Sequence, residues 1–384
     1  MRRLLSRFGG RGPVYSAVFL MVIVCTSGSP IFGDGEPPVP DGRRLREIVS
    51  QNFPKGAVLI GATIGAGGLR RPSLAIVLDR EFGYVTPEND YKHMIVRADP
   101  ANWNWTPADA WEKHVKASGQ VLRMHCPIGP QCSRWAKEDV RTAEELSNEL
   151  KAFLQKICQR YNGKHGYAYM DVVNETIEKG NWHKDKAGST QWECPWFKIG
   201  QDTDKNKTPL FIGMSFEVAK QFAPDTKFIF NHHEEPAAVN SWRLIKETIH
   251  YLRARNLRVD GIGWQAHVDS GWETPERLAR LKDLITWAHA NSLEFHVTEA
   301  SVWLKKGRSE TQLKGQADTY RAILRALLEN RQGGVVAWNT WHVSDAVGWH
   351  TEWHPSLFDA DCRAKPAYYA IHEELVRATR DGER

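Results

Sequence analysis

Hydrophobic and polar positions alternate along this chain in a series of short apolar runs and longer amphipathic stretches. The apolar runs have the length and the flanking turn residues of buried β-strands. They cover residues 57–64, 83–87, 120–125, 167–173, 227–231, 260–267, 293–298 and 334–341. Helical patterns lie near residues 107–118, 143–160, 210–222, 240–255, 275–291, 311–330 and 366–378. The two earliest connections have a less clear pattern.

Strand candidates that alternate with helices through one chain predict an α/β fold, a single (β/α)8 TIM barrel. The competing architecture is a doubly wound open sheet, which would usually have a glycine-rich first turn. Residues 61–67 are rich in glycine, but their spacing misses the dinucleotide-binding pattern. No linker, repeat or low-complexity tract follows residue 45, so we expect one barrel domain over residues 51–380.

The N-terminus has the pattern of an export signal. Four arginines precede a mostly apolar run of 12 residues, Val14 to Cys25, and small residues follow it. That run is too short to span a bilayer comfortably. We expect residues 1–30 to be a signal peptide, residues 31–50 a flexible lead, and the protein to be secreted, periplasmic or on the cell surface. An uncleaved anchor is the alternative.

The net charge changes when this segment is removed. The whole chain carries a formal charge of +5, and four of the positive charges lie in the lead, so the mature chain is near +1 (5 − 4). Such a balance predicts no nucleic-acid partner. We also expect no stable membrane insertion after cleavage, and a monomer.

Cysteine usage gives a weaker signal. Without Cys25, five cysteines remain, so at least one thiol stays free even where export permits disulfides. Cys158 lies on a helical pattern, and we expect a buried thiol there. The others, which lie in loop-like stretches, could pair: Cys126, Cys132, Cys194 and Cys362. No spacing resembles a metal site, and we expect no metal and no cofactor.

Polar or aromatic residues follow most of the predicted strands. In a barrel they would meet on one rim, where active sites of this fold lie. A polar residue at one strand end often only begins a loop, but the full series favours a site. The series is Glu88 and Asn89, His125, Asn174 and Glu175, His232 to Glu234, Gln265 and His267, Glu299, and Trp341 and His342.

Two members of this series are carboxylates at the ends of apolar runs. Residues 171–175 read Asp-Val-Val-Asn-Glu, and residues 296–299 read His-Val-Thr-Glu. Two carboxylates of this kind suit the cleavage of a glycosidic bond, in which one protonates the leaving oxygen and the other meets the positive charge at the sugar carbon. Taken singly, Glu175 could instead be a charge at a helix N-terminus and Glu299 a rim salt bridge.

Several segments carry a resemblance to a known family. Thr86 to Asn89 followed by Lys92 resembles T-P-E-N-x-x-K, and residues 171–175 match D-V-V-N-E. Further along are segments similar to G-I-G-x-Q-x-H at 261–267, V-T-E at 297–299, W-x-x-x-D-x-x-x-W at 341–349, L-F-D at 357–359 and K-P-A-Y at 365–368. Together they resemble glycoside hydrolase family 10, the endo-β-1,4-xylanase family, from about residue 57 to 375.

The resemblance implies roles at the matching positions. Glu175 would be the general acid/base and Glu299 the nucleophile of a retaining mechanism. Asn174 would bind the 2-hydroxyl of the sugar at the cleaved bond. The other implied substrate contacts are Glu88, Asn89 and Lys92 for the next sugar, His125, Gln265 and His267 for hydroxyls or the nucleophile, and Trp341 and Trp349 for an aromatic wall.

The chain also departs from the family pattern. His125 lacks the Trp-His pair that usually follows it, and His93 stands where the family has Trp. Residues 231–234 read Asn-His-His-Glu instead of N-D-Y-N, and Ala300-Ser301 replace Leu-Asp. We interpret the two histidines at 232–233 as part of a polar rim, since adjacent residues rarely bind one ion together.

The leading hypothesis is therefore a secreted retaining endo-glycosidase whose partner is a polysaccharide, β-1,4-xylan or a related β-glycan. The altered residues around the site leave open a barrel hydrolase for a different or decorated β-glycan. A carbohydrate-binding barrel without turnover is the alternative from another class, although a binding protein has no need of both glutamates.

Overall fold

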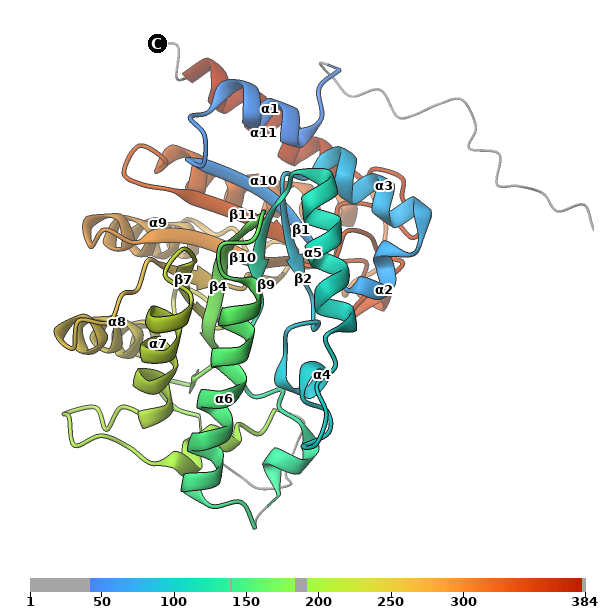
Figure 1. Cartoon of the computed structure of the whole chain (residues 1–384). Coiled ribbons are helices and arrows are strands. Elements are labelled where there is room, and N and C mark those ends of the chain that lie inside the picture. Colours follow the sequence, from blue (N-terminus) through green and yellow to red (C-terminus); the bar gives the residue numbers. More distant parts are fainter. Residues whose placement is uncertain (1–41, 139, 184–191, 382–384) are drawn as a thin grey trace, which may run out of the picture. The chain divides into compact units, whose positions relative to one another are not determined.

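The computed structural model describes residues 42–138, 140–183 and 192–381. Eight parallel strands close into a barrel, because β11 pairs back to β1 (Figure 1). In ring order they are β1 (Val58–Ile64), β2 (Tyr84–Pro87), β3 (Val121–Met124), β4 (Tyr167–Asn174), β7 (Lys227–His232), β8 (Gly261–Trp264), β10 (Glu294–Trp303) and β11 (Val336–Thr340). The predicted (β/α)8 barrel is confirmed.

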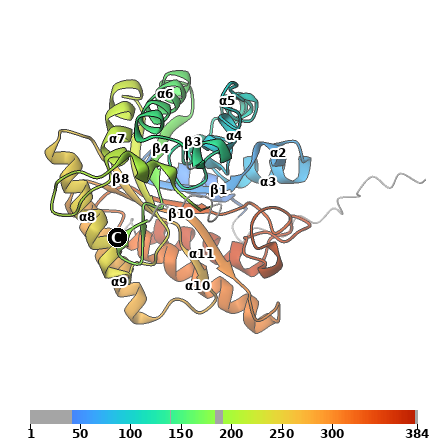
Figure 2. The same ribbon diagram turned by 90° about the horizontal axis from the view of Figure 1, so that it is seen from below.

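Helices follow the strands and surround them (Figure 2). They are α2 (Ala66–Leu69) and α3 (Pro72–Glu81) after β1, α4 (His93–Val96) and α5 (Thr106–Ser118) after β2, α6 (Ala143–Tyr161) after β3, α7 (Leu210–Phe222) after β4, α8 (Val239–Ala254) after β7, α9 (Pro275–Ala290) after β8, α10 (Glu310–Glu329) after β10 and α11 (Pro366–Asp381) after β11. Shorter elements are the hairpin β5 (Ile177–Glu178) and β6 (Asn181–Trp182), β9 (His267–Asp269), and the 3-10 helices η1 (Arg134–Lys137), η2 (Pro195–Ile199) and η3 (Thr351–Trp353).

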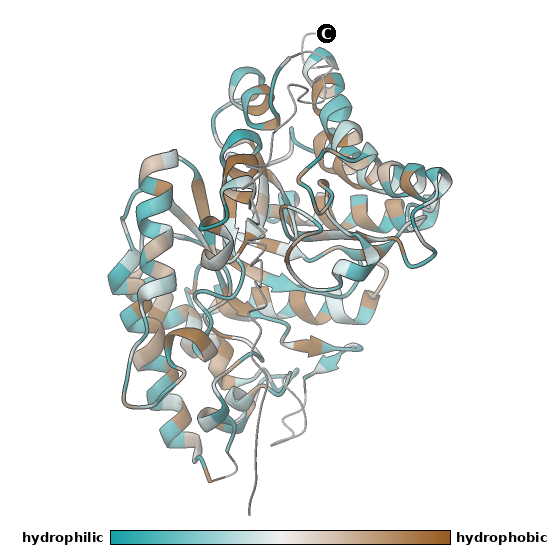
Figure 3. Ribbon diagram, turned by 90° about the vertical axis from the view of Figure 1, so that its right-hand side faces the viewer, coloured by the Kyte–Doolittle hydropathy of each residue, from teal (hydrophilic) through white to brown (hydrophobic). Residues whose placement is uncertain are grey.

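Helix α6 illustrates how local sequence signals produce these elements. Thr142 and Glu145 form a capping box, in which the hydroxyl accepts from the Glu145 amide at 3.1 Å and the carboxylate accepts from the Thr142 amide at 2.8 Å. Caps of this kind contribute about 1 kcal/mol each. The buried residues recur at helical spacing and pack toward the barrel: Leu146, Leu150, Phe153, Leu154 and Ile157. Figure 3 shows the same striping on the other long helices.

The barrel interior changes character along its axis. Near the amino ends of the strands it is filled by a small apolar and aromatic cluster of Leu59, Tyr84, Tyr169, Ile229 and Ala337. Further along the strands the interior becomes polar, with Arg123 and Asp171 both fully buried. The apolar layer closes the barrel at the amino ends of the strands. The polar groups lie towards the carboxyl ends.

The N-terminal boundary differs from the prediction. A flexible lead was expected to reach residue 50, but α1 (Leu45–Asn52) begins at residue 45. Leu45 and Ile48 are fully buried, and α1 lies beside α11. The sequence did not reveal this because α1 packs against α11, which comes from the far end of the chain, as well as against β1 and α3. The predicted signal peptide lies outside the described residues.

Two strand predictions also need correction. The run at 260–267 is split into β8 and β9, because Ala266 has a left-handed φ of 57° between them. The run predicted to end at residue 298 instead continues to Trp303, because Ser301 to Trp303 pair with β9. Both differences extend the wall of the barrel on the side of α9.

The cysteines of the described chain all carry free thiols, including the loop cysteines that could have paired. Cys158 is buried as predicted, and its burial raises the pKa of the thiol to about 12. Among the described residues, no helix combines the length and the apolar character that crossing a membrane requires.

Candidate active site

Glu175 follows directly on the end of β4, at the barrel rim. Its φ is 54°, a left-handed conformation that costs a non-glycine residue about 1–3 kcal/mol. The backbone amide donates to the carbonyl of Asn231 at 3.2 Å, which holds the turn in place. Ala266 and His342, which follow β8 and β11, have φ values of 57° and 75°. Strained turns thus surround the predicted site, as is common where side chains are aimed for function.

Glu299 lies within β10 and is nearly completely buried. The prediction that it ends its strand was wrong, because the strand continues beyond it. The pairing of β10 with β11 shifts in register between Val297 and Ala300. Irregularities of this kind change the direction of nearby side chains, and Glu299 lies within the segment where the register shifts.

A chain of side-chain amides joins the two glutamates. Asn231 Nδ2 donates to Oε1 of Glu299 and to Oδ1 of Asn174, both at 2.8 Å. Gln265 Nε2 donates to the same Asn174 oxygen at 3.2 Å and to Oε1 of Glu175 at 2.8 Å. The structure therefore brings four predicted site residues into one network, although their catalytic roles stay predictions.

This network requires a residue without a side chain in β8. Gly263 lies between Asn231 and β10, and a Cβ there would sit 2.4 Å from Oδ1 of Asn231 and 2.7 Å from Cγ2 of Thr298. The hydroxyl of Thr298 donates to that Asn231 oxygen at 2.7 Å, which fixes the orientation of the amide. Only glycine leaves room for this contact across the strand.

The surroundings of Glu299 keep it ionised. Burial alone would raise its pKa, but the charge of His125, a hydrogen bond from His267 and the charge of Arg123 outweigh burial and lower the pKa of Glu299 to about 2. His267 Nε2 donates to Oε2 at 3.3 Å, and His125 Nδ1 lies 3.8 Å from Oε1. A carboxylate held in this way can act as a nucleophile near neutral pH.

His125 is itself supported from inside the barrel. Its Nδ1 donates to Oδ2 of Asp171 at 2.7 Å, and Asp171 is paired with Arg123. Burial lowers the pKa of His125, but Cys126, Glu299 and Asp171 raise it more, to about 9. His125 therefore carries a positive charge beside Glu299 over most of the physiological range.

Aromatic rings line the rim around His267. Trp341 is nearly buried and meets the rings of His125 and His267 edge-on, with centroids 5.2 and 6.3 Å apart. Trp349 is 44% exposed and lies 5.4 Å from His267. Trp303 is stacked on His267 at 6.0 Å with an interplanar angle of 3°. An exposed indole in this position offers a flat face to a sugar ring.

Glu88, Asn89 and Lys92 lie on the rim after β2. The Glu88 carboxylate is 3.4 Å from Nε2 of His342, next to Trp341. Burial would raise the pKa of Glu88, but His342 and Lys92 lower it below its ordinary value. Lys92 is buried and donates to Gln131, in the loop after β3 that departs from the family pattern. Of these residues, Glu88 connects to Glu299 through His342, Trp341 and His125.

Two of the departures are buried side chains that do not face the rim. His93 is fully buried among Trp135, Phe153 and Trp196, and its ring is part of the packing under α6. His232 was expected on a polar rim, but its side chain is fully buried, with Nε2 3.2 Å from Glu234. Burial lowers the pKa of His232, which favours the neutral ring.

Sequence reasoning missed several residues that shape the site. Arg123, Asp171 and Asn231 occupy inward positions on strands, where a polar residue in an apolar run was the available signal. Trp303 was missed because its strand was predicted to end five residues earlier, at 298 (303 − 298). Each of these side chains acts through residues that the prediction did identify.

The fold and the site together define a class of protein. A parallel barrel carries, at the carboxyl ends of its strands, one carboxylate held ionised and a second, half-buried carboxyl linked to it by amides. That combination is typical of barrels that act on glycosidic bonds with two acidic residues.

Comparison with known proteins agrees. Residues 45–374 match the sequence profile of glycosyl hydrolase family 10, and the chain belongs to this family. Endo-1,4-beta-xylanase A of Humicola insolens is 26% identical over 316 residues, which cover 79% of this chain and 77% of that protein. Endo-1,4-beta-xylanase C of Paenibacillus barcinonensis is 26% identical over 318 residues, 77% of this chain. The chain spans only 28% of that relative's length.

Solved structures share the fold. Xylanase 10B from Thermotoga petrophila, in complex with xylobiose, superposes with a TM-score of 0.75 and 24% identity over 88% of this chain and 98% of that one. Xylanase B from Clostridium stercorarium gives a TM-score of 0.72 and 23% identity over 86% of this chain and 99% of that one.

Proposed function

We propose that this protein is a retaining endo-glycosidase that hydrolyses β-1,4-xylan or a related β-glycan. The observation that carries the proposal is the paired environment of the two glutamates. Glu299 is buried and held ionised by two histidines, whereas Glu175 is only half-buried and bonded to a single amide. Two carboxyls in unlike surroundings can take the unlike roles that the reaction needs.

In the first step, Glu299 attacks the anomeric carbon while Glu175 transfers a proton to the departing glycosidic oxygen. The positive charge that develops on the sugar lies over the Glu299 carboxylate. Asn231 and His267 hold the two carboxylate oxygens, so the group is oriented before the reaction begins. The product of this step is a glycosyl ester on Glu299.

In the second step, Glu175 takes a proton from a water molecule, and the oxygen of that water attacks the anomeric carbon and releases Glu299. Two inversions give net retention. Gln265 holds Glu175 at the rim in both steps. Its amide N–H donates to Oε1 of Glu175, and that oxygen can accept the hydrogen bond whether the carboxyl group acts as acid or as base.

The substrate class is supported by the relatives. The two relatives compared above are named endo-1,4-beta-xylanases, and a structural neighbour was solved with xylobiose. The loop after β3 favours a second candidate, a hydrolase for a different or decorated β-glycan, because Lys92 contacts Gln131 in this loop and the family's Trp-His pair is missing.

The test is reducing-sugar release from xylan, cellulose and mannan, with sizing of the products. We expect wild-type protein to release oligosaccharides from xylan, and Glu175→Ala to lose about 10²–10⁴-fold in kcat because proton transfer is removed. Glu299→Ala should be inactive. Glu217→Ala, on the exposed face of α7, is the control and should match wild type.

Proton NMR of the first product formed tests the stereochemistry. A β-anomer formed first supports retention, and an α-anomer would exclude the double displacement. Release from another glycan alone would favour the second candidate. No release from any glycan, with binding intact, would favour a carbohydrate-binding barrel.

We also propose export of the mature protein, since a polymer such as xylan is met outside the cell. The basic lead and the apolar run of residues 1–30 support it. N-terminal sequencing of protein recovered from the medium or periplasm would show the cleavage point, and a full-length cytoplasmic product would contradict export.

A further inference from the structure

The end of β7 and the loop after it surround Glu175 with backbone contacts. The carbonyl of Asn231 accepts from the amide of Glu175 at 3.2 Å. The carbonyl of His232 accepts from the backbone amide of Gln265 at 3.0 Å, and the Gln265 side chain donates to Oε1 of Glu175 at 2.8 Å. This segment, which departs from the family pattern, thus holds both the backbone of Glu175 and the residue that binds its carboxyl.

The hairpin of β5 and β6 begins two residues after Glu175. Each of its strands has two residues, and a two-stranded hairpin is marginally stable on its own. Its turn residues Lys179 and Gly180 have positive φ values of 50° and 75°, as the tight turn between two such strands requires. A fixed position of this hairpin therefore requires contacts from outside it.

Glu234 makes these contacts. Its Oε1 accepts from the amide of Lys179 at 2.9 Å. Its Oε2 accepts from the hydroxyl of Ser241, whose oxygen accepts from the amide of Gly180 at 2.9 Å. His232 Nε2 donates to the same Oε2 at 3.2 Å. Both amides of the hairpin turn are thus bonded, directly or through one hydroxyl, to a single carboxylate.

The Glu234 carboxylate keeps its charge. Burial would raise its pKa, but hydrogen bonds from His232, Ser241 and the Lys179 amide lower it to about 2. Hydrogen bonds to a charged acceptor are roughly twice as strong as those between neutral groups. The contacts to the hairpin are therefore strong ones at any pH at which the protein would work.

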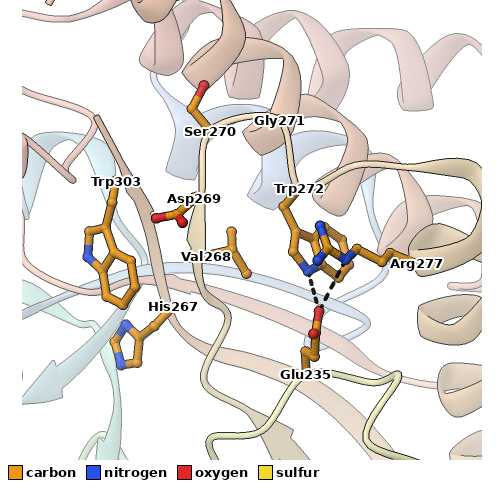
Figure 4. A pocket seen from close by; sticks show the side chains of 9 residues that line it. All are labelled: Glu235, His267, Val268, Asp269, Ser270, Gly271, Trp272, Arg277 and Trp303. Carbon is orange, nitrogen blue, oxygen red and sulfur yellow. Dashed lines mark hydrogen bonds and ion pairs between the residues drawn. The ribbon is translucent and has the colours of Figure 1, made fainter. Parts of the chain in front are cut away.

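The neighbouring Glu235 fixes the loop itself. Figure 4 shows its carboxylate between Trp272 and Arg277: it accepts from Trp272 Nε1 at 2.8 Å and lies 3.4 Å from Arg277. The carbonyl of Glu235 accepts from Trp242 Nε1 at 3.0 Å, and both tryptophans are nearly buried. The loop is thus anchored to α8 and to the segment before α9, so Glu234 holds the hairpin from a fixed base.

Glu175 lies between these two anchored parts. A left-handed backbone conformation such as its own persists only where the surrounding structure over-determines it. Asn231 restrains Glu175 on one side. On the other, the carbonyl of Thr176 accepts from the amide of His183 at 3.0 Å, which ties the next residue to the hairpin. Release of the hairpin would let Glu175 relax and turn its carboxyl away from the cleaved bond.

We propose that Glu234 is a positioning residue for proton transfer. It holds the β5–β6 hairpin, and the hairpin fixes the direction in which Glu175 presents its carboxyl to the glycosidic oxygen. The inference rests on the proposed function, since it takes Glu175 to be the proton donor. It adds to that function a residue that acts on the acid through the backbone alone.

The experiment compares kcat/KM on two aryl β-xylobiosides. A dinitrophenyl group departs without a proton, whereas an unsubstituted phenyl group needs one, and kcat/KM reports the step in which the bond breaks. We expect Glu234→Ala to lose about 10–10²-fold on the phenyl glycoside and to match wild type on the dinitrophenyl glycoside. A merely structural role would lower both rates equally. Ser241→Ala should show the same pattern with a smaller loss, and it serves as the test if Glu234→Ala does not fold.

Asp260→Ala is the matched control. Asp260 precedes β8 at the opposite end of the barrel, its side chain is 22% exposed against 17% for Glu234, and it accepts from the Phe228 amide at 2.8 Å. The ratio of its two rates should equal that of wild type. An equal loss on both glycosides in Glu234→Ala, or no loss on either, would overturn the positioning role and leave the hydrolase intact. Failure of wild type to cleave either glycoside or any polymer would instead overturn the proposed function.

Discussion

Asn231 reaches across β8 to hold Glu299, with its Nδ2 2.8 Å from Oε1 of the glutamate. The two residues lie on β7 and β10, which are not neighbours in the barrel. The contact exists because the intervening position is Gly263, which has no side chain to block it. The orientation of the candidate nucleophile thus depends on a missing side chain as much as on a hydrogen bond.

Gly263→Ala tests this dependence. A Cβ 2.4 Å from Asn231 Oδ1 cannot be accommodated without displacing the amide or Thr298, so we expect a large loss of kcat and a destabilisation of about 1–3 kcal/mol. Kinetics and urea unfolding measure the two effects. Gly213→Ala in α7 is the control: its nearest neighbour is 4.0 Å away, and alanine there should be neutral or stabilising. Wild-type activity in Gly263→Ala would contradict the argument.

Asp171→Ala should be among the most destabilising single changes in the barrel. It leaves the fully buried Arg123 without its carboxylate partner, and breaking a buried pair costs about 3–5 kcal/mol. Urea unfolding should show a lowered midpoint. Removing the exposed partner of Arg321 by Glu373→Ala should cost under about 1 kcal/mol. Similar small losses in both variants would show that the buried pair adds no more than a surface pair.

The depressed pKa of Glu299 predicts a pH dependence of stability. Its pKa is about 2 in the folded protein against an ordinary 4.5, so the ionised group stabilises the fold above about pH 4.5. That contribution is lost as the pH falls from 4.5 towards 2. The difference in Tm between wild type and Glu299→Gln should be constant above pH 5 and shift against wild type below 4.5. A difference that stays constant down to pH 2 would refute the shift.

His125 should act in the opposite direction. Its pKa is raised to about 9 from an ordinary 6.5, so its charge stabilises the fold fully below pH 6.5, and this contribution is lost as the pH rises through 9. Because that charge also lowers the pKa of Glu299, His125→Gln should move the acid limb of the kcat/KM profile to higher pH. His165→Gln, at an exposed position, should leave the limb in place.

The sequence predicted the barrel well because strands and helices here have clear periodicities. Helix α7 occupies the predicted residues 210–222, and six other helices lie within three residues of their predicted ends. The residues of the rim could also be predicted, since the carboxyl ends of all strands of a parallel barrel lie on one face. Six predicted site residues, Glu175, Asn174, Gln265, Glu299, His267 and His125, meet through hydrogen bonds and ion pairs.

The remainder depends on contacts between distant parts of the chain. The burial of His93 is decided by Trp135, Phe153 and Trp196, which no local pattern connects to it. The extension of β10 to Trp303 depends on pairing with β9. The role of Gly263 depends on side chains from the strands on either side. Periodicity reports which face of an element is buried, and it carries no information about what lies across from it.

The polar interior of the barrel has a consequence for how this protein can diverge. The groups that lower the pKa of Glu299 stand on strands or directly after them, whereas Gln131, which contacts Lys92, belongs to the connecting loop after β3. If the proposed function holds, we expect reaction chemistry and ligand preference to be encoded in separable parts of the chain. Loops could be exchanged to accept new glycans while the acid-base machinery is inherited unchanged.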